Sequence, residues 1–283
     1  MSFPLLYLSD QRTLFMGTPL DLGRHAVPAS RLLICLKGEL SYQPHGEGPP
    51  IPCTSLLLPA GLPVRVNAAQ AVVADFYLDV CGFDYAVLRQ QARRCDYGIH
   101  CDLRDEALLF KTLESLRRCA APADELWAQV APLLNPPDLV ATASFHIDPR
   151  VVTVVQTIKR TTRENLSLDD LADSVGVSSS RLISLFKQQV GIPIRRYRLW
   201  RRLHHAAYLL AAGCSLTEAA MGSGFADSAH FSRTFLEMLG FQPSTLTRGQ
   251  SPVKILVTSS KSYESRPSAH SPERAASSFN PPA

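Results

Sequence analysis

Long apolar runs are missing from this sequence. Even the longest, such as residues 151–155 and 56–58, fall far short of the roughly 20 residues that a membrane-spanning helix needs. The first residues also lack the basic segment followed by an apolar one that marks a secretory leader. We therefore expect a soluble, cytoplasmic protein that does not associate with membranes.

Paired cysteines and clustered histidines are missing as well. The seven cysteines contain no Cys-x-x-Cys pair and are odd in number, so we expect reduced thiols, most of them small core residues. The N-terminal half offers His25, His45 and Glu47 without His-x-His spacing. The sequence therefore predicts no metal site, no cofactor and no catalytic residues, and the protein is not expected to be an enzyme.

Positive charge is concentrated in one part of the chain. The chain has 283 residues, a length that suggests two domains. Its formal net charge is +4. Residues 1–149 hold 12 basic and 16 acidic side chains, net −4, whereas residues 150–250 hold 13 basic and 7 acidic, net +6. The later segment is therefore the one suited to a polyanion.

The apolar pattern changes character along the N-terminal half. From residue 31 to 78, short apolar runs are broken by Gly and Pro, which predicts an all-β sandwich or barrel. Helical periodicity follows at 84–95, 105–119 and 123–134, and the apolar stripe of the second helix either covers the β domain or pairs with a second subunit. Prolines in 135–150 predict a linker, and the Ser- and Pro-rich residues beyond about 258 predict disorder.

The basic segment contains a helix-turn-helix pattern after a first helix at 151–163. Ser167 can cap a short helix, Gly176 supplies the turn, and Ser178 caps a second helix. The inward positions of that second helix are Leu182, Leu185 and Phe186. Its outward positions are Ser180, Arg181, Ser184 and Lys187, with Ile183 at the edge, and these are the side chains that could enter a major groove.

A second copy of the pattern follows from residue 215. Gly224 and Phe225 stand at its turn, and Asp227 is a candidate cap for the next helix. The expected buried face comprises Phe231, Phe235 and Met238. The positions left for DNA are Ser228, Ala229, Ser232 and Arg233.

One long helix is expected between the two copies, from Pro193 to about Ala212. About 18 to 20 helical residues span roughly 27 to 30 Å, close to the roughly 34 Å of one DNA turn, so two recognition helices could enter successive major grooves. The phosphate candidates are Arg181, Lys187, Arg196 and Arg202. Arg202 could instead form an internal ion pair, and the basic cluster at 195–202 could simply be a solvated helix face.

Over about 100 residues the basic segment resembles the AraC/XylS family of transcription regulators. The matching positions are Leu168, Leu171, Ala172, Ser180, Arg181, Leu182, Leu185, Phe186, Lys187, Gly191, Pro193, Tyr197, Arg202, Leu203, Ala207, Leu209, Leu210, Leu216, Ala219, Ala220, Gly224, Phe225, Phe231, Ser232, Arg233, Phe235, Gly240 and Pro243. The resemblance implies base and phosphate contacts by Ser180 and Ser184 in the first recognition helix and by Ser228, Ser232 and Arg233 in the second. Several of these positions carry Ser or Ala where relatives often have Gln, Arg or His, so specificity is expected to depend on Arg233, phosphate positioning and DNA shape.

Residues 36–40 and 56–61 resemble the cupin-like sensor half that is common in this family. The predicted fold is therefore α+β, with an N-terminal cupin-like β-barrel, a helical extension and a C-terminal all-α double helix-turn-helix domain. The predicted boundaries are 1–83 for the sensor, 84–148 for the dimerisation or linker region, 149–250 for the DNA-binding domain and 251–283 for a disordered tail.

The functional prediction is an effector-responsive, dimer-capable regulator of double-stranded promoter DNA, with RNA polymerase as a further partner. Two other readings remain open at this stage. One is a β-barrel small-molecule or metal-binding enzyme that carries a DNA-binding appendage. The other is a regulator controlled by a protein partner through the helices at 84–134, without a small-molecule ligand.

Overall fold

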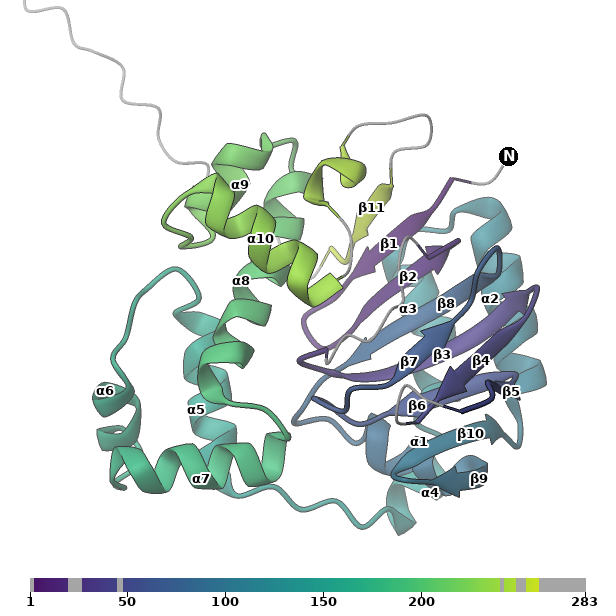
Figure 1. Cartoon of the computed structure of the whole chain (residues 1–283), viewed down its shortest axis with the longest axis horizontal. Coiled ribbons are helices and arrows are strands. Elements are labelled where there is room, and N and C mark those ends of the chain that lie inside the picture. The colour runs from purple at the N-terminus through teal and green to yellow at the C-terminus, as the bar shows by residue number, and fades with distance from the viewer. Residues whose placement is uncertain (1–2, 20–26, 45–47, 240–241, 248–252, 260–283) are drawn as a thin grey trace, which may run out of the picture.

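A β-rich half and a helical half lie side by side in the computed structural model, which describes residues 3–19, 27–44, 48–239, 242–247 and 253–259 (Figure 1). The strands are β1 (Leu5–Leu8), β2 (Thr13–Gly17), β3 (Ser30–Lys37), β4 (Leu40–Gln43), β5 (Ile51–Cys53), β6 (Ser55–Leu58), β7 (Arg65–Asn67), β8 (Val72–Leu78), β9 (Ala92–Asp96), β10 (Ile99–Leu103) and β11 (Lys254–Val257). The helices are α1 (Asp84–Gln91), α2 (Glu106–Cys119), α3 (Ala123–Leu134), α4 (Pro137–Thr142), α5 (Pro149–Arg160), α6 (Leu168–Asp173), α7 (Ser179–Val190), α8 (Ile194–Ala211), α9 (Leu216–Gly222) and α10 (Ser228–Leu239), followed by a 3₁₀ turn at Pro243–Leu246.

The strands form two sheets, and the larger one is covered on both faces. Its order is β11-β1-β2-β8-β3-β6-β10-β9, and every pair is antiparallel except β1 with β11. On one face, residues such as Tyr7, Met16 and Phe76 pack with apolar residues of α2 and α3. On the other face, Leu6 and Phe15 of the same strands contact the helical half. Burial on both faces explains why these strands are apolar at nearly every position.

The α+β prediction is confirmed, but the predicted barrel is not closed. The larger sheet ends at β9 and β11, which are not paired with each other, and the described strands β5, β4 and β7 form a separate three-stranded sheet. A third core between the sheets joins Leu33 and Val73 to Tyr42 and Val66. Two stacked sheets bury these side chains without closure, because each sheet offers one apolar face.

Two predicted elements between residues 84 and 150 differ from the structure. The helix predicted over 84–95 ends at residue 91, because residues 92–96 form β9 and pair with β10. Tyr97 and Gly98, at φ +50° and +74°, make the tight turn of this hairpin. The predicted linker contains the short helix α4.

The segment predicted as a disordered tail contains a strand of the N-terminal sheet. β11 pairs in parallel with β1, in the register Leu5 with Lys254 to Leu8 with Val257. Ser259 then donates from its backbone and its hydroxyl to the Asp124 carboxylate of α3. The predicted tail therefore includes an ordered anchor at 253–259, and its residues 260–283 lie outside the described residues.

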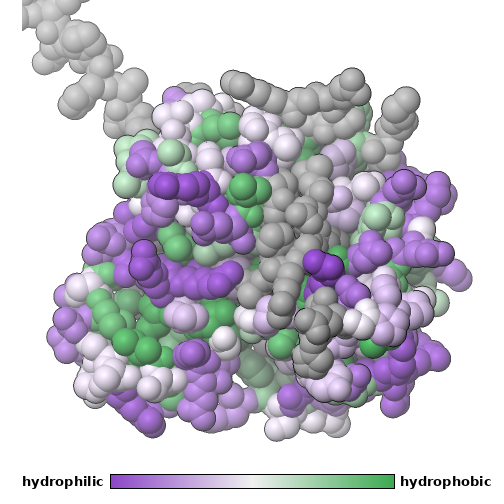
Figure 2. All heavy atoms as spheres, viewed as in Figure 1, coloured by the Kyte–Doolittle hydropathy of each residue, from purple (hydrophilic) through white to green (hydrophobic). Residues whose placement is uncertain are grey.

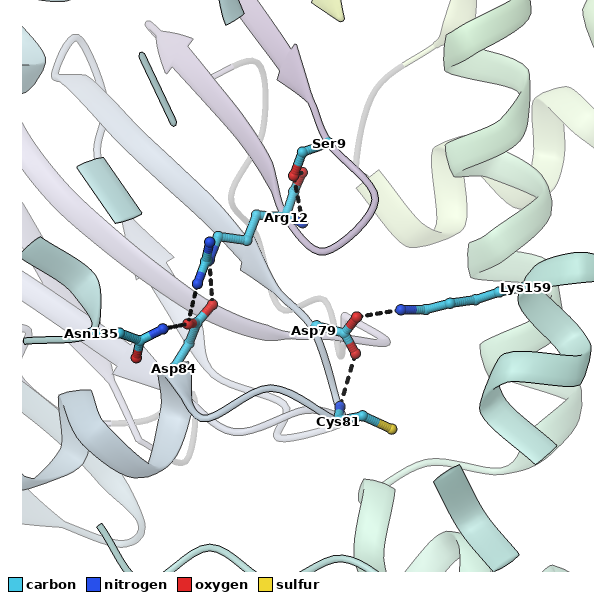
Figure 3. Close-up of polar contacts among 7 residues, drawn as sticks. All are labelled: Ser9, Arg12, Asp79, Cys81, Asp84, Asn135 and Lys159. Atoms are coloured by element: carbon cyan, nitrogen blue, oxygen red, sulfur yellow. Dashed lines mark hydrogen bonds and ion pairs between the residues drawn. The ribbon is translucent and has the colours of Figure 1, made fainter. Parts of the chain in front are cut away.

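Ion pairs join the two halves or brace their junction. Lys159 of α5 pairs with Asp79, which follows β8, so this contact crosses directly between the halves (Figure 3). Nearby, Arg12 binds both oxygens of Asp84 at 2.6 and 2.7 Å, and Asn135 donates to the same carboxylate. These pairs are largely buried, so removing one partner would leave a charge poorly solvated.

The cysteine prediction is only partly right. All seven cysteines are free thiols, but Cys101 is the one that is fully buried, and Cys95 and Cys119 are exposed. The three side chains considered as metal ligands in the N-terminal half, His25, His45 and Glu47, lie outside the described residues. Within the described ranges no group of three or more potential metal ligands occurs. The described helices include none that is long and apolar enough to cross a bilayer.

Candidate nucleic-acid interface

The first helix-turn-helix unit, α6 and α7, is held by its caps. Ser167 accepts from the Asp170 backbone at 3.0 Å and the Asp170 carboxylate accepts from the Ser167 backbone at 2.9 Å, a reciprocal capping box. Gly176 has φ +65° in the turn, a conformation that side chains beyond glycine disfavour. Ser178 then caps α7 by accepting from the Arg181 backbone. The predicted helix, turn and helix are confirmed.

The inward face of α7 packs into one core with its neighbours. Leu182 and Phe186 are fully buried, and the Phe186 ring lies 5.7 Å from the Tyr197 ring of α8. The same core includes Val27 and Ala29 of the N-terminal half. The orientation of this recognition helix is therefore fixed partly by the β-rich half.

The outward face of α7 is exposed to solvent. The exposed residues that the sequence assigns to DNA are Ser180, Arg181, Ile183, Ser184 and Lys187. Ile183 is a large apolar side chain that is 45% exposed, although Leu and Phe at the neighbouring inward positions are buried. Exposed apolar groups of this kind on a recognition helix can contact the methyl group of thymine.

The second unit, α9 and α10, repeats the same construction. Ser215 and Glu218 form a capping box, and Asp227 accepts from the His230 backbone at 2.6 Å at the start of α10. Gly224 has φ +81°, and a Cβ there would lie 3.1 Å from the Arg163 carbonyl oxygen. Both the turn and the close approach therefore require glycine at this position.

The faces of α10 follow the sequence prediction. Phe231, Phe235 and Met238 are buried. The rings of Phe231 and Phe235 pack edge to face, with their centres 5.7 Å apart. The residues on the opposite face are Ser228, Ala229 and Arg233, which are exposed, and Ser232, which is partly buried.

Helix α8 is the strut between the two units. It has 18 residues, and at 1.5 Å per residue it extends about 27 Å. Its Tyr197, Trp200 and Leu203 are buried, so they pack within the protein, as expected. Arg201 is only 7% exposed and faces Asp10 of the N-terminal half, so it is turned away from the surface where DNA would lie.

A basic concavity lies between the two recognition helices. It has a volume of about 1030 Å³ with its opening, and Ile183 of α7 and His230 of α10 stand on its two sides. Arg195, Arg198 and Arg202 of α8 line it between them. Figure 2 shows hydrophilic side chains gathered over α8, between the two units.

Two arginines of this concavity, Arg198 and Arg202, are partly desolvated. Burial lowers the pKa of Arg198, and burial together with the charge of Arg198 lowers that of Arg202. Arginine nevertheless stays protonated at neutral pH. Arg198 donates to the Leu166 and Glu164 carbonyls, and within the described residues Arg202 has no carboxylate partner. Such cations gain most from an anion that docks against them.

The phosphate candidates on α8 differ in whether they line the concavity. Arg202 lines the concavity, whereas Arg196 does not, because it lies on another face of α8. Arg195 and Arg198 line it and were not singled out from the sequence. The spacing of 195, 198 and 202 places them on one helix face, and that periodicity could have identified them.

Sequence comparison agrees with this geometry. A family described as a helix-turn-helix domain matches residues 171–249. The regulatory protein of the arabinose operon of Escherichia coli is 34% identical over 86 residues, which are 30% of this chain and 30% of that protein. The C-terminal helical region is an AraC-type helix-turn-helix domain.

Other relatives match the AraC-type domain as well. The transcriptional regulator GbdR of Pseudomonas aeruginosa is 33% identical over 103 residues, and the transcriptional activator RhaS of Escherichia fergusonii is 32% identical over 106. The matches cover 36% and 37% of this chain. The chain spans only 28% and 38% of the lengths of these two relatives.

The likeness of the whole fold extends beyond the AraC-type domain. The structure of ToxT from Vibrio cholerae O395 covers 83% of this chain and 95% of its own, with a TM-score of 0.55 and 14% identity. At this identity the comparison shows a shared fold, in which a β-rich half and an AraC-type domain are combined.

Proposed function

We propose that the protein is a sequence-specific, DNA-binding regulator of transcription that places α7 and α10 in successive major grooves of promoter DNA. The observation that carries this proposal is the basic concavity between two exposed recognition faces, joined by one rigid helix. The proposal that the protein is not an enzyme is supported by relatives that are named as regulators.

The roles of the side chains follow from their positions. Base edges or groove walls are assigned to Ser180, Ile183, Ser184, Ser228, Ala229, Ser232 and Arg233. Phosphates are assigned to Arg181, Lys187 and Arg202, to which the geometry adds Arg195 and Arg198. Arg196 remains a phosphate candidate from the sequence alone. Because five of the groove-facing residues are Ser or Ala, we expect DNA shape to contribute much of the specificity.

The proposal is tested by gel-shift titration of the full chain on its own upstream promoter and on random DNA of equal length. Specific regulators typically bind their sites at least 1,000-fold more tightly than nonspecific DNA at physiological salt. Equal affinity for both fragments would remove the claim of sequence specificity.

Arg233→Ala is expected to weaken binding to the specific site by about 1 to 3 kcal/mol, and to reduce discrimination between sites. Arg233 is the exposed, long side chain on the base-facing side of α10, and arginine reads guanine with two hydrogen bonds. The measurement is competition binding with single-base variants of the site. Arg118→Ala is the matched control, since Arg118 is 78% exposed on α2 and its loss changes the net charge equally. An identical loss on every sequence would reassign Arg233 to a phosphate.

Lys187→Ala is expected to weaken binding by a similar factor on all sequences, because a lysine that neutralises a phosphate carries no sequence information. The slope of log affinity against log salt should become shallower by about one unit. Titrations at several salt concentrations measure this slope. A loss confined to one base position, with an unchanged slope, would contradict the assignment.

Effector response, dimerisation and RNA polymerase as a partner are further parts of the proposal. Structures of ToxT include complexes with an unsaturated fatty acid and with a naphthalenyl butenoic acid. By analogy, we propose a small apolar molecule as the effector of the present chain and the β-rich half as its sensor. The predicted boundaries at 83, 148 and 250 and the cytoplasmic location remain proposals.

A further inference from the structure

An apolar cavity lies between the larger sheet and the second helix-turn-helix unit. Its walls come from both halves, for example Leu8 and Phe15 from the sheet, Trp200 and Ala207 from α8, and Phe235 from α10. Its volume, with its opening to solvent, is about 740 Å³. Inside its walls, the space open to the centres of water-sized molecules is about 80 Å³, so the cavity suits a small ligand.

The lining of the cavity is aromatic as well as apolar. Rings of Phe15, Tyr77, Trp200 and Phe235 reach it, and those of Tyr77 and Trp200 lie 5.1 Å apart across the junction of the two halves. Aromatic walls favour ligands with a ring, because offset and edge-to-face ring contacts add to the gain from burial.

Among the described lining residues, the cavity offers no Lys or Arg side chain to an anionic ligand. In the described part of the chain, the ionisable lining side chains are Asp75, Tyr77 and His204. Arg31 donates to both carboxylate oxygens of Asp75, at 3.1 and 2.6 Å, so the charge of Arg31 is already balanced by that of Asp75. Burial raises the pKa of Tyr77, and the Nε2 of His204 lies 3.1 Å from the carbonyl oxygen of Ser9.

A carboxylate in this cavity would therefore be desolvated without a Lys or Arg partner among the described lining residues. Such burial is strongly unfavourable, and the acid would have to bind in its protonated form. An uncharged molecule meets no such cost, and Thr13 contributes a hydroxyl-bearing side chain to the wall.

We propose that this cavity binds an uncharged small molecule that carries an aromatic ring. Because the molecule contacts the sheet, α8 and α10 together, its binding stabilises the docked position of the second recognition helix. This regulatory consequence rests on the proposed function, whereas the binding itself does not.

The two tryptophans provide a direct readout of binding. Trp200 lines the cavity, whereas Trp127 of α3 packs against Phe76 on the opposite face of the sheet. In the Trp127→Phe variant of the full chain, Trp200 is the remaining tryptophan, so tryptophan fluorescence reports on the cavity alone. The probes are 4-butylbenzyl alcohol and 4-butylbenzoate, which share ring and chain and differ in charge.

The alcohol is expected to change Trp200 emission and to bind at least tenfold more tightly than the carboxylate at neutral pH. Equal affinities, tighter binding of the carboxylate, or no binding of either probe would overturn the proposal. Two variants on α8 locate the site. Ala207→Leu narrows the cavity and should reduce alcohol binding at least tenfold, whereas Ala211→Leu, the same change at an exposed position of the same helix, should not.

Leu239→Lys serves as a gain-of-function variant. Leu239 lines the cavity near the end of α10 and is only partly buried, so a lysine there can keep its stem on the apolar wall. This variant should bind 4-butylbenzoate at least tenfold more tightly than the unsubstituted chain does. No gain in the folded variant would show that charge does not set the preference.

Gel-shift titration with and without the alcohol then tests the regulatory consequence. A change of threefold or more in affinity for the promoter site supports it, and an unchanged affinity overturns it while the cavity assignment stands. Because fluorescence is measured without DNA, a protein that binds the probe but no specific DNA would contradict the proposed function and not the ligand site.

Discussion

Asp75→Ala is expected to destabilise the folded protein by about 3 to 5 kcal/mol, as is typical when one partner of a buried ion pair is removed. Arg31 and Asp75 are 5% and 2% exposed. Although burial opposes its charge, the Asp75 carboxylate raises the pKa of Arg31, so the guanidinium stays charged. Without Asp75, the charged guanidinium of Arg31 would remain in a buried site, 5.3 Å from the centre of the Tyr77 ring. Urea unfolding of the full chain measures the loss.

Two variants show whether the unpaired charge is the cause. Glu125→Ala removes a carboxylate from the exposed surface of α3, where its contact is a surface hydrogen bond with Gln129, and such changes cost about 1 kcal/mol or less. The double change Arg31→Met with Asp75→Leu should recover most of the stability, because apolar residues of similar volume can replace a buried pair. A single-variant loss below about 1 kcal/mol would contradict the buried-charge argument.

Phe186→Ala is expected to cost about 3 to 5 kcal/mol and to abolish specific DNA binding. Phe186 is fully buried, and its removal leaves a cavity that rigid neighbours fill only in part. The ring also fixes α7 against Tyr197 of the strut, so the first recognition helix loses its defined orientation. Unfolding curves and gel-shift titrations measure the two effects separately.

The matched control for this prediction is Phe83→Ala. Phe83 is 43% exposed and its ring contacts Phe145, so its loss should cost about 1 kcal/mol or less and leave DNA binding intact. If Phe186→Ala retained normal affinity and specificity, α7 would not be a recognition helix.

The helix-turn-helix units were predictable because their determinants are local. Ser167 and Ser178 cap the helices they were expected to cap, since a cap hydrogen bond needs only a neighbour three residues away. The buried and exposed faces of α7 and α10 followed from helical periodicity for the same reason.

The remaining features depend on contacts between distant segments. β9 was expected to be helix because residues 92–96 lack strand periodicity, and pairing with β10 overrides that preference. Arg198 is positioned by carbonyls more than 30 residues away, and the apolar cavity exists only where β1, β2 and β8 meet α8 and α10. Sequence reasoning could name the residue types involved but not their neighbours.

The pairing of β11 with β1 makes the helical half a closed loop. Residues between α5 and β11 are attached to the same β-rich half at both ends, first through the chain before α5 and then through four paired residues at the sheet edge. Once such a loop is closed, separation of the halves gains little chain entropy unless β11 is also released. Motion that leaves β11 in place is thus confined to a rocking of the helices on the sheet, and larger rearrangements require the sheet to lose its outermost strand.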